Sequence, residues 1–206
     1  MLVRKDNQYM RIIAATKNAG KIKEIESIFK GLGIEAVSQQ EEGFDVDIEE
    51  TGDSFEKNAL IKARAVAMLT DDIVMADDSG LCIDALDGRP GIYSARYAGE
   101  NASDRAKIQK ILTEMEPHKN RSAKFVTAVA VILPDGREFV TTGEVKGEIL
   151  REPVGENGFG YDPIFYCDEL KKTFAQAAEE EKNMVSHRGR ALRAMYKKLE
   201  PILKED

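Results

Sequence analysis

Apolar residues form short runs in some segments of the chain and recur at helical spacing in others, which indicates alternating strands and helices. The run RIIAAT at residues 11–16 predicts a buried strand. The next apolar residues follow helical spacing: Ile22, Ile25, Ile28, Phe29 and Leu32. Gly31 and Gly33 end this helix, so the chain is predicted to open with a strand, a turn and a helix.

A second helix is predicted to start near Asp53 or Ser54, because Glu56 follows Asp53 at the spacing of a capping box. Its apolar face contains Phe55, Ala59, Ala63, Val66 and Leu69.

Two carboxylates follow the next predicted strand, the short run IVMA at residues 73–76. Asp77 and Asp78 come directly after this run and are followed by Ser79 and Gly80. The carboxylates are therefore expected at the C-terminal end of a core strand, where open α/β sheets place their ligands.

Two more helices are predicted in the second half of the chain. The first covers residues 103–115, with Ser103 or Asp104 as its cap, and the last helix of the chain is capped by Ser186. The inward positions of the first are Ile108, Ile111, Leu112 and Met115, and those of the last are Leu192, Met195, Tyr196, Leu199 and Leu203.

Two long strands are predicted between these helices. The run FVTAVAVIL is apolar on both faces, which favours a central strand, whereas REFVTTGEVKGEIL alternates more and carries polar residues on one side. Pro134, Asp135 and Gly136 form the hairpin turn between them. This order of elements predicts an α/β fold.

Composition narrows the class of protein. With 206 residues, 42% of them hydrophobic, the chain is long enough for one domain or two tightly joined lobes. It shows no signal sequence and no apolar run long enough for a membrane span, so a soluble, cytoplasmic protein is expected. Cys82 and Cys167 lack metal-ligand spacing and are interpreted as two buried thiols.

A net charge of −7 argues against nucleic acid or an acidic membrane as a partner. An anionic ligand would therefore need local basic groups, helix N-termini or a divalent cation.

The segment TKNAGK joins the first strand to the first helix and has the character of an anion site. Asn18 is a potential helix cap, and Lys17 and Lys21 add positive charge beside the helix N-terminus. The spacing of a Walker A loop is absent, which argues against a P-loop ATPase or kinase. An ordinary capped turn with solvated lysines is the alternative interpretation.

Acidic side chains gather in two segments, residues 45–50 and the pair Asp77 and Asp78. Mg²⁺ prefers one or two carboxylates and keeps several waters for bridging to phosphates, so this pairing suggests a magnesium site. Because neighbouring residues of an extended chain point to opposite sides, one of Asp77 and Asp78 is expected to face the ligand. For Asp45, Asp47 and Glu49 a solvated acidic loop is the favoured interpretation.

Two later segments carry groups suited to a nucleobase. GENGFGYDP at residues 155–163 allows close backbone approach and supplies Phe159 or Tyr161 for stacking, although a bulged loop with packed aromatic rings is an alternative. Lys182, His187 and Arg188 are expected around the start of the last helix, as donors toward phosphate or base oxygens. A lone His at a helix start is more often structural, but its position next to Arg188 and near Lys182 favours the binding interpretation.

Five segments resemble the inosine/xanthosine triphosphate pyrophosphatase family, also called Ham1-like, and they occur in a fixed order over nearly the whole chain. They are ATKNAGK, EETGDSFEKNALIKARAVA, ADDSGLCIDALDGRPGIYSARYAG, REPVGENGFGYDPIF and EEKNMVSHRGRAL. The resemblance implies one α/β domain over residues 1–206, with an elongated two-lobed fold, a long mixed sheet flanked by helices, an active-site cleft between the lobes, and a homodimer.

The resemblance also implies the reaction and the residues that perform it. Non-standard purine nucleoside triphosphates such as ITP, dITP and XTP would be hydrolysed to the monophosphate and pyrophosphate, which removes deaminated purines from the nucleotide pool. Glu50 and Asp78 would hold Mg²⁺, with Asp78 also the base. The substrate-binding positions implied are Thr16, Lys17, Asn18, Ala19, Gly20, Lys21, Ser79, Phe159, Gly160, Tyr161, Asp162, Lys182, His187 and Arg188. Lys17 departs from the family pattern, in which many members have Gly.

Two other functions are compatible with parts of the pattern. A Maf-like pyrophosphatase would act on modified pyrimidine or methylated nucleotides, and the SHR segment argues against it. A nucleotide sensor without catalysis would use the acidic groups only to hold a magnesium nucleotide, and the presence of both Glu50 and Asp78 disfavours it.

Overall fold

The computed structural model describes residues 10–16 and 18–204, with Ala19 described by its backbone alone. The helices and strands follow the order β1 (Arg11–Ala14), α1 (Ala19–Phe29), β2 (Glu35–Ser38), α2 (Phe55–Ala67), β3 (Ile73–Ile83), α3 (Asp104–Met115), β4 (Ser122–Ile132), β5 (Glu138–Ile149), β6 (Phe165–Cys167), β7 (Lys172–Thr173), α4 (Glu179–Val185) and α5 (His187–Lys204). Short 3₁₀ helices occur at Lys30–Leu32, Asp84–Leu86, Gly91–Arg96 and Asp162–Ile164.

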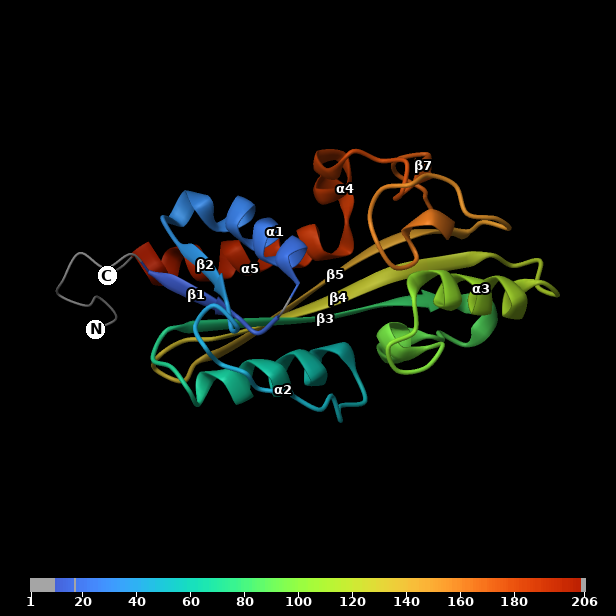
Figure 1. Cartoon of the computed structure of the whole chain (residues 1–206). Helices are drawn as coiled ribbons and strands as arrows, with labels where there is room; N and C mark the ends of the chain where they lie inside the picture. The colour runs from blue at the N-terminus through green and yellow to red at the C-terminus, as the bar shows by residue number, and fades with distance from the viewer. Residues whose placement is uncertain (1–9, 17, 205–206) are drawn as a thin grey trace. The chain divides into compact units, whose positions relative to one another are not determined.

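The strands form one mixed seven-stranded sheet in the order β2-β1-β3-β4-β5-β6-β7 (Figure 1). β1 is parallel to β2 and to β3, with Ile12 opposite Ala36 and Ile73 respectively. At the other end, β6 is antiparallel to both β5 and β7. The predicted α/β fold with a mixed sheet flanked by helices is confirmed.

The chain divides into two compact units, each made of separate segments. Unit 1 takes in Met1–Asp78, Ala128–Thr142 and Gly189–Asp206, and unit 2 takes in Ser79–Thr127 and Gly143–Arg188. The division therefore falls within β3, β4, β5 and α5, and each unit has hydrophobic core residues of its own.

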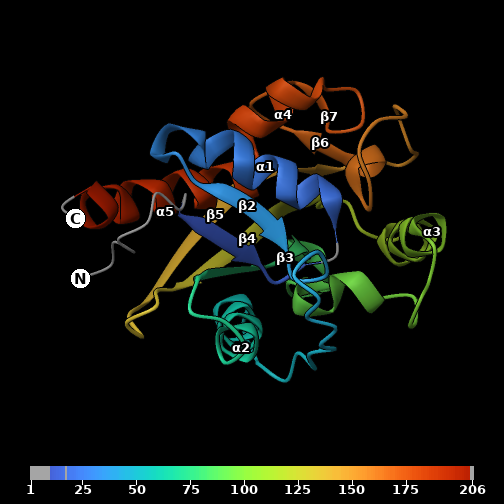
Figure 2. The ribbon, with the colours of Figure 1, turned by 60° about the vertical axis from the view of Figure 1, so that its left-hand side comes forward.

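In unit 1 the strands bury both faces. Successive residues of β3, such as Val74 and Met75, enter two different cores because neighbouring side chains of a strand point to opposite sides. One core joins the sheet to α1 and α5, and the other joins it to α2, so these helices cover opposite faces (Figure 2). β4 contributes Val129 to one core and Ala128 to the other, which confirms its predicted place as a central strand.

The caps of the first two helices differ in how well they were predicted. Asn18 caps α1 as expected. α2 is capped by Ser54, whose Oγ accepts from the Lys57 N–H at 3.3 Å. The capping box from Asp53 is wrong, because the Asp53 carboxylate pairs with the Lys57 ammonium instead. Leu69 was also misplaced, since it lies beyond the end of α2 and is 47% exposed.

The strand that carries Asp77 and Asp78 is much longer than predicted. β3 continues to Ile83, so both carboxylates lie within the strand and not at its end. The reason is that Leu81 and Ile83 are fully buried in the core of unit 2, which holds the chain extended past the acidic pair. β1 does end at Ala14, opposite Met75, so Asp77 and Asp78 still lie beyond the carboxyl end of the neighbouring parallel strand.

Unit 2 is built around α3 and a group of aromatic rings. Ser103 caps α3, with its Oγ accepting from the Ala106 N–H at 3.2 Å. The buried face of α3 consists of Ile108, Ile111 and Met115, as predicted, while Leu112 is half-buried. The Phe125 ring packs against Phe165 and Phe174, with centroids 4.6 Å and 5.9 Å away.

The hairpin and the last helix follow the prediction, whereas α4 was missed. The turn at Pro134–Gly136 is closed by a hydrogen bond from the Leu133 N–H to the Arg137 carbonyl at 2.9 Å. α5 begins at His187, directly after Ser186, and buries Leu192, Met195, Leu199 and Leu203, with Tyr196 packed beside them. α4 is a short polar helix without buried residues, so no apolar spacing revealed it.

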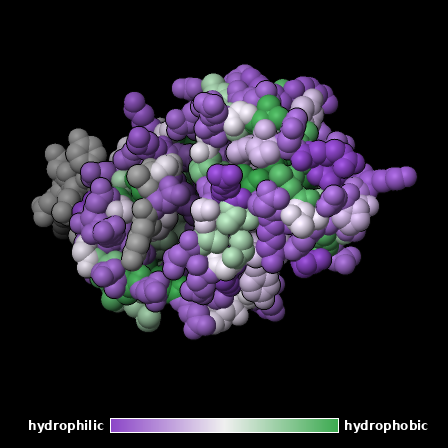
Figure 3. Space-filling view, turned by 45° about the vertical axis from the view of Figure 1, so that its right-hand side comes forward, coloured by the Kyte–Doolittle hydropathy of each residue, from purple (hydrophilic) through white to green (hydrophobic). Residues whose placement is uncertain are grey.

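The face of the molecule seen in Figure 3 is mostly polar. Hydrophilic side chains cover most of the face in Figure 3, and the large exposed apolar side chains of the described residues are Met68, Leu69, Tyr93, Phe159 and Met184. None of the described helices combines the length and apolar character needed to cross a membrane. Cys167 is buried as expected, but Cys82 is only half-buried.

Arg121 joins the end of α3 to the end of β5. Its guanidinium donates to the carbonyl oxygens of Met115, Ile149 and Leu150 at 2.9, 2.8 and 2.7 Å. Arg121→Met should lower the free energy of unfolding by about 2 kcal/mol, because three hydrogen bonds are lost and their acceptors remain partly buried. Chemical denaturation measures the change. Arg137→Met, which removes an exposed turn residue, should have only a slight effect, and equal losses in the two variants would contradict the assignment.

Candidate active site

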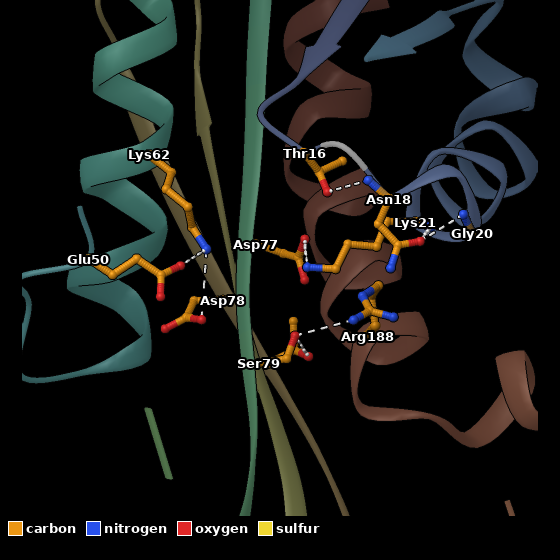
Figure 4. Close-up of polar contacts among 11 residues, drawn as sticks. Thr16, Asn18, Gly20, Lys21, Glu50, Lys62, Asp77, Asp78, Ser79 and Arg188 are labelled. Carbon is orange, nitrogen blue, oxygen red and sulfur yellow. Dashed lines mark hydrogen bonds and ion pairs between the residues drawn. The ribbon is translucent and has the colours of Figure 1, made fainter. Parts of the chain in front are cut away.

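Asp77 and Asp78 point to opposite faces of β3 (Figure 4). Asp77 lies on the side of α1, where Lys21 Nζ is 2.9 Å from its Oδ1. Asp78 lies on the side of α2, where Lys62 approaches it. The alternation of a strand thus separates the pair into two charge clusters of unit 1, and the prediction that the two residues face different ways is confirmed.

The cluster on the α2 side brings Glu50 and Asp78 to one ammonium group. Lys62 Nζ is 2.5 Å from Glu50 Oε1 and 3.8 Å from Asp78 Oδ1 (Figure 4). The side chains of all three are largely buried, with exposed fractions of 20% or less. Two carboxylates from distant segments therefore converge where water screens their charges poorly.

Asn58 orients the Asp78 carboxylate. It lies one helical turn before Lys62 in α2, is fully buried, and its Nδ2 donates to Asp78 Oδ2 at 3.1 Å. Its Oδ1 accepts from the Gly52 N–H at 2.8 Å. A Cβ at Gly52 would lie 2.6 Å from that oxygen, so glycine is needed for this approach. Asn58 thereby connects Asp78 to the segment that carries Glu50.

Burial and charge act together on this cluster. Burial raises the pKa of Asp78, Lys62 acts to lower it, Glu50 raises it further, and the result is a raised pKa. For Lys62, burial acts to lower the pKa, but the carboxylates of Asp78, Asp77 and Glu50 outweigh it, so its pKa is raised. Lys62 is therefore a charged group that partly neutralises a crowded acidic site.

The turn at the start of α1 forms the second cluster. The Asn18 side chain accepts from the N–H groups of Gly20 and Lys21, at 2.9 and 3.3 Å. Thr16 Oγ1 in turn accepts from the Asn18 N–H at 3.2 Å. Lys17 lies outside the described residues. The ion pair between Lys21 and Asp77 thus links the capped turn at the start of α1 to β3.

In unit 2, Ser79 is hydrogen-bonded to side chains of β4 and α5. Thr127 Oγ1, on β4, lies 2.9 Å from Ser79 Oγ, and the Arg188 guanidinium donates to the same oxygen at 3.4 Å. Thr127 is fully buried and Arg188 nearly so. Ser79 and Arg188, predicted from separate segments, are therefore neighbours, and Thr127 holds the Ser79 hydroxyl through a hydrogen bond.

The glycine-rich segment of unit 2 presents an aromatic ring to solvent. Phe159 is 48% exposed, and Lys182 Nζ lies 4.7 Å from the centre of its ring. The same ammonium is 2.5 Å from Asp162 Oδ2, which also accepts from the Phe159 N–H at 2.9 Å. At Gly158, φ is +76° and a Cβ would lie 2.1 Å from Asp162 Oδ2, so only glycine fits. Phe159, Asp162 and Lys182, which were each predicted as binding residues, are therefore in direct contact with one another.

Two predicted site residues have buried rings. Tyr161 is 5% exposed, belongs to the core of unit 2, and donates its hydroxyl to the Ser94 carbonyl at 2.8 Å. Of the two rings considered for stacking, the exposed one is therefore Phe159. The His187 ring is also buried and stacks on Phe125, with centroids 4.8 Å apart.

The α2-side cluster fits a hard divalent cation. Mg²⁺ needs only one or two protein carboxylates when substrate and water supply the remaining oxygens. Glu50 and Asp78 both face the Lys62 ammonium, so they are the two carboxylates of this cluster that could hold such a cation. No group of three or more His, Cys, Asp or Glu side chains among the described residues is arranged to hold a metal alone, so any cation here would depend on other oxygens.

Three residues of these clusters were not predicted individually. Asn58 and Lys62 are one helical turn apart beside the apolar face of α2, and this polar pair is a signal that the sequence contained. Thr127 is a hydroxyl residue within an otherwise apolar strand. Each supports a predicted residue by direct contact.

The family model described as the Ham1 family matches residues 12–198 of the chain. The chain belongs to the Ham1 family. A relative from Bacillus subtilis named dITP/XTP pyrophosphatase is 49% identical over 190 residues, covering 91% of this chain and 96% of the relative. A Bacillus cereus protein of the same name is 46% identical over 193 residues, covering 92% and 94%.

Solved structures of Ham1 proteins have the same fold. The Staphylococcus aureus Ham1 protein matches with a TM-score of 0.85 and 46% identity, covering 93% of this chain and 98% of that one. A Ham1 protein from Coxiella burnetii has a TM-score of 0.85 and 42% identity, covering 96% and 100%.

The raised pKa of Asp78 predicts a stability effect. At pH values above that pKa, the ionised carboxylate destabilises the folded chain, whereas below about pH 3 it is largely protonated in both states. In the presence of a chelator, Asp78→Asn should therefore raise the melting temperature at about pH 8 by about 2–4 °C. The gain should shrink as the pH falls toward about 4.

Thermal unfolding followed by circular dichroism at several pH values measures this effect. Asp47→Asn, in an exposed position, is the matched control and should leave the melting temperature unchanged. A lower melting temperature for Asp78→Asn at high pH would mean that the carboxylate stabilises the fold.

Proposed function

We propose that this Ham1-family protein is a magnesium-dependent pyrophosphatase that hydrolyses non-standard purine nucleoside triphosphates, such as ITP, dITP and XTP, to the monophosphate and pyrophosphate. The observation that carries the proposal is the convergence of Glu50 and Asp78 on one largely buried ammonium, that of Lys62. The names of the relatives, dITP/XTP pyrophosphatase, supply the substrate class. A cytoplasmic homodimer is part of the same proposal.

Binding of the triphosphate falls to basic groups of unit 1. Lys21 stands at the first turn of α1, where a helix N-terminus favours negative charge, and its ammonium is within reach of Asp77. Phosphate oxygens would compete with Asp77 for this ammonium. Lys62 offers a second positive charge at the carboxylate cluster. These two ammonium groups would offset charge that develops on the pyrophosphate leaving group.

Asp78 is the group best placed to accept a proton from the attacking water. The water oxygen bonds to the α-phosphorus while the bond from that phosphorus to the bridging oxygen breaks, and pyrophosphate leaves. In the absence of a metal ion, burial raises the pKa of Asp78. Asn58 keeps the carboxylate oriented through Oδ2. Because Asp77 points to the opposite face of β3, its direct role is to pair with Lys21.

A magnesium ion held by Glu50 and Asp78 would supply electrostatic neutralisation of phosphate oxygens. In the absence of such an ion, Lys62 is the positive charge beside both carboxylates.

Recognition of the base falls to Phe159 and Lys182 in unit 2. The exposed Phe159 ring offers a surface for stacking, and Lys182 holds an ammonium donor over the same ring. A donor that bonds to the 6-oxygen of hypoxanthine or xanthine would face the 6-amino group of adenine. That group is itself a donor, so the hydrogen bond would be lost. Discrimination of this kind is strong when polar groups of the site are left unpaired. Rejection of GTP requires a further contact at the 2-amino group.

Incubation with ITP and Mg²⁺ should release pyrophosphate, measured by a coupled assay. Asp78→Asn should reduce kcat by about 1000-fold or more while nucleotide binding is largely kept, because the proton acceptor is lost and the side-chain shape is retained. Removal of Mg²⁺ by a chelator should also abolish release. Asp47→Asn is the matched control, with activity within about twofold of the original chain.

The product distinguishes the alternatives. Binding of ITP without any product would indicate a nucleotide sensor, and release of orthophosphate from ITP would indicate a phosphatase.

A substrate panel tests base selection. The kcat/KM values for ITP and XTP should exceed those for ATP and GTP by about 100-fold or more. Lys182→Met should reduce the preference for ITP over ATP by about tenfold, with pyrophosphate still the product. Lys119→Met changes an exposed lysine and should keep the preference. Equal rates with the four substrates would refute the selectivity, and faster hydrolysis of modified pyrimidine nucleotides would favour a Maf-like activity.

A further inference from the structure

The backbone around Phe159 is held by two carboxylates from different parts of unit 2. The Phe159 N–H donates to Asp162 Oδ2 at 2.9 Å, and the next N–H, that of Gly160, donates to Asp104 Oδ2 at 2.7 Å. Asp162 belongs to the same segment, whereas Asp104 is the first residue of α3 and lies 56 positions away in the sequence. Asp104 is thus an external support for the peptide that follows the exposed ring.

Both oxygens of Asp104 are engaged. Oδ1 is 2.7 Å from the ammonium of Lys107, whose side chain is mostly buried, and Oδ2 accepts from Gly160. The ion pair within α3 therefore sets the direction of the carboxylate before it meets the loop. The contacts with Lys107 and Gly160 also lower the pKa of Asp104 against the opposing effect of burial, so the group is ionised at neutral pH.

Capping of α3 is carried out by a different residue. Ser103 Oγ accepts from the Ala106 N–H, so the side chain of Asp104 is not needed for the cap. The other side of the glycine-rich segment is held through the backbone, where the Asn157 N–H donates to the Ala175 carbonyl at 3.0 Å. Loss of Asp104 would therefore release one side of the segment and leave α3 capped.

We propose that Asp104 is a positioning residue for base recognition, which holds the Phe159–Gly160 peptide so that the Phe159 ring is presented in a fixed orientation to the purine. The identity of the ligand as a purine nucleotide rests on the proposed function, whereas the contact between Asp104 and the Gly160 N–H does not. Asp104 acts through Gly160 and does not touch the base. Its loss should weaken nucleotide binding more than it slows the chemical step.

Steady-state kinetics with ITP and hydrogen–deuterium exchange over residues 155–162 test the proposal together. Asp104→Ala should raise KM about fivefold, with kcat within about twofold, and should speed exchange in this segment. Asp104→Asn retains an oxygen that can accept from the Gly160 N–H but loses the ion pair with Lys107, so its KM should rise less than that of Asp104→Ala. Ser103→Ala, which removes the α3 cap, should lower thermal stability without changing KM.

The outcomes separate positioning from stability and from the proposed function. Unchanged KM and exchange in Asp104→Ala would overturn the proposal, as would an equal rise in KM for Ser103→Ala. A fall in kcat alone would also overturn it. If the original chain releases no pyrophosphate from any nucleotide, the proposed function fails, while faster exchange in Asp104→Ala and its rescue in Asp104→Asn would still establish the support of the loop.

Discussion

The buried carboxylate of Asp78 is the constraint on which the rest of the candidate site depends. A charge placed inside a protein is costly unless neighbouring groups compensate for it. Here the compensation comes from the Lys62 ammonium and from the Asn58 amide, both on α2. The position of α2 against the sheet, which its alanine-rich face permits, is therefore as important for the chemistry as the acidic residue itself.

Short-range geometry distributes the charges of unit 1. The two-residue repeat of β3 sends Asp77 toward α1 and Asp78 toward α2. The helical repeat of α2 then places Asn58 and Lys62 on the same side of that helix. Two clusters of opposite charges result, one at Lys21 and one at Lys62.

Much of the fold could be predicted from the sequence because it depends on local patterns. The apolar face of α5, the central place of β4 and the Asn18 cap follow from spacing within a few residues. The length of β3 could not be predicted in this way, because the polar run at Asp77 and Asp78 resembles the end of a strand. Burial of Leu81 and Ile83 in a separate core keeps the strand extended, and that is a long-range effect.

The same distinction applies to the candidate site. Residues proposed to carry the chemistry, such as Asp78, Glu50 and Phe159, stood out through their type and motif. Residues that hold them in place, such as Thr127 and Asp104, make contacts across 48 and 56 positions of sequence. A threonine in a strand or an aspartate at a helix start has ordinary local explanations, so only the folded chain reveals these partners.

The continuity of β3 through the acidic pair limits how this segment can vary. Since each residue of a strand faces the side opposite to its neighbours, removal or insertion of a single residue between the buried start of β3 and Asp77 would exchange the faces of the two carboxylates. Asp78 would then be presented to Lys21 and lose Lys62 and Asn58. Changes of side chain in this stretch alter one contact at a time, whereas a change of length would invert the whole arrangement of charges.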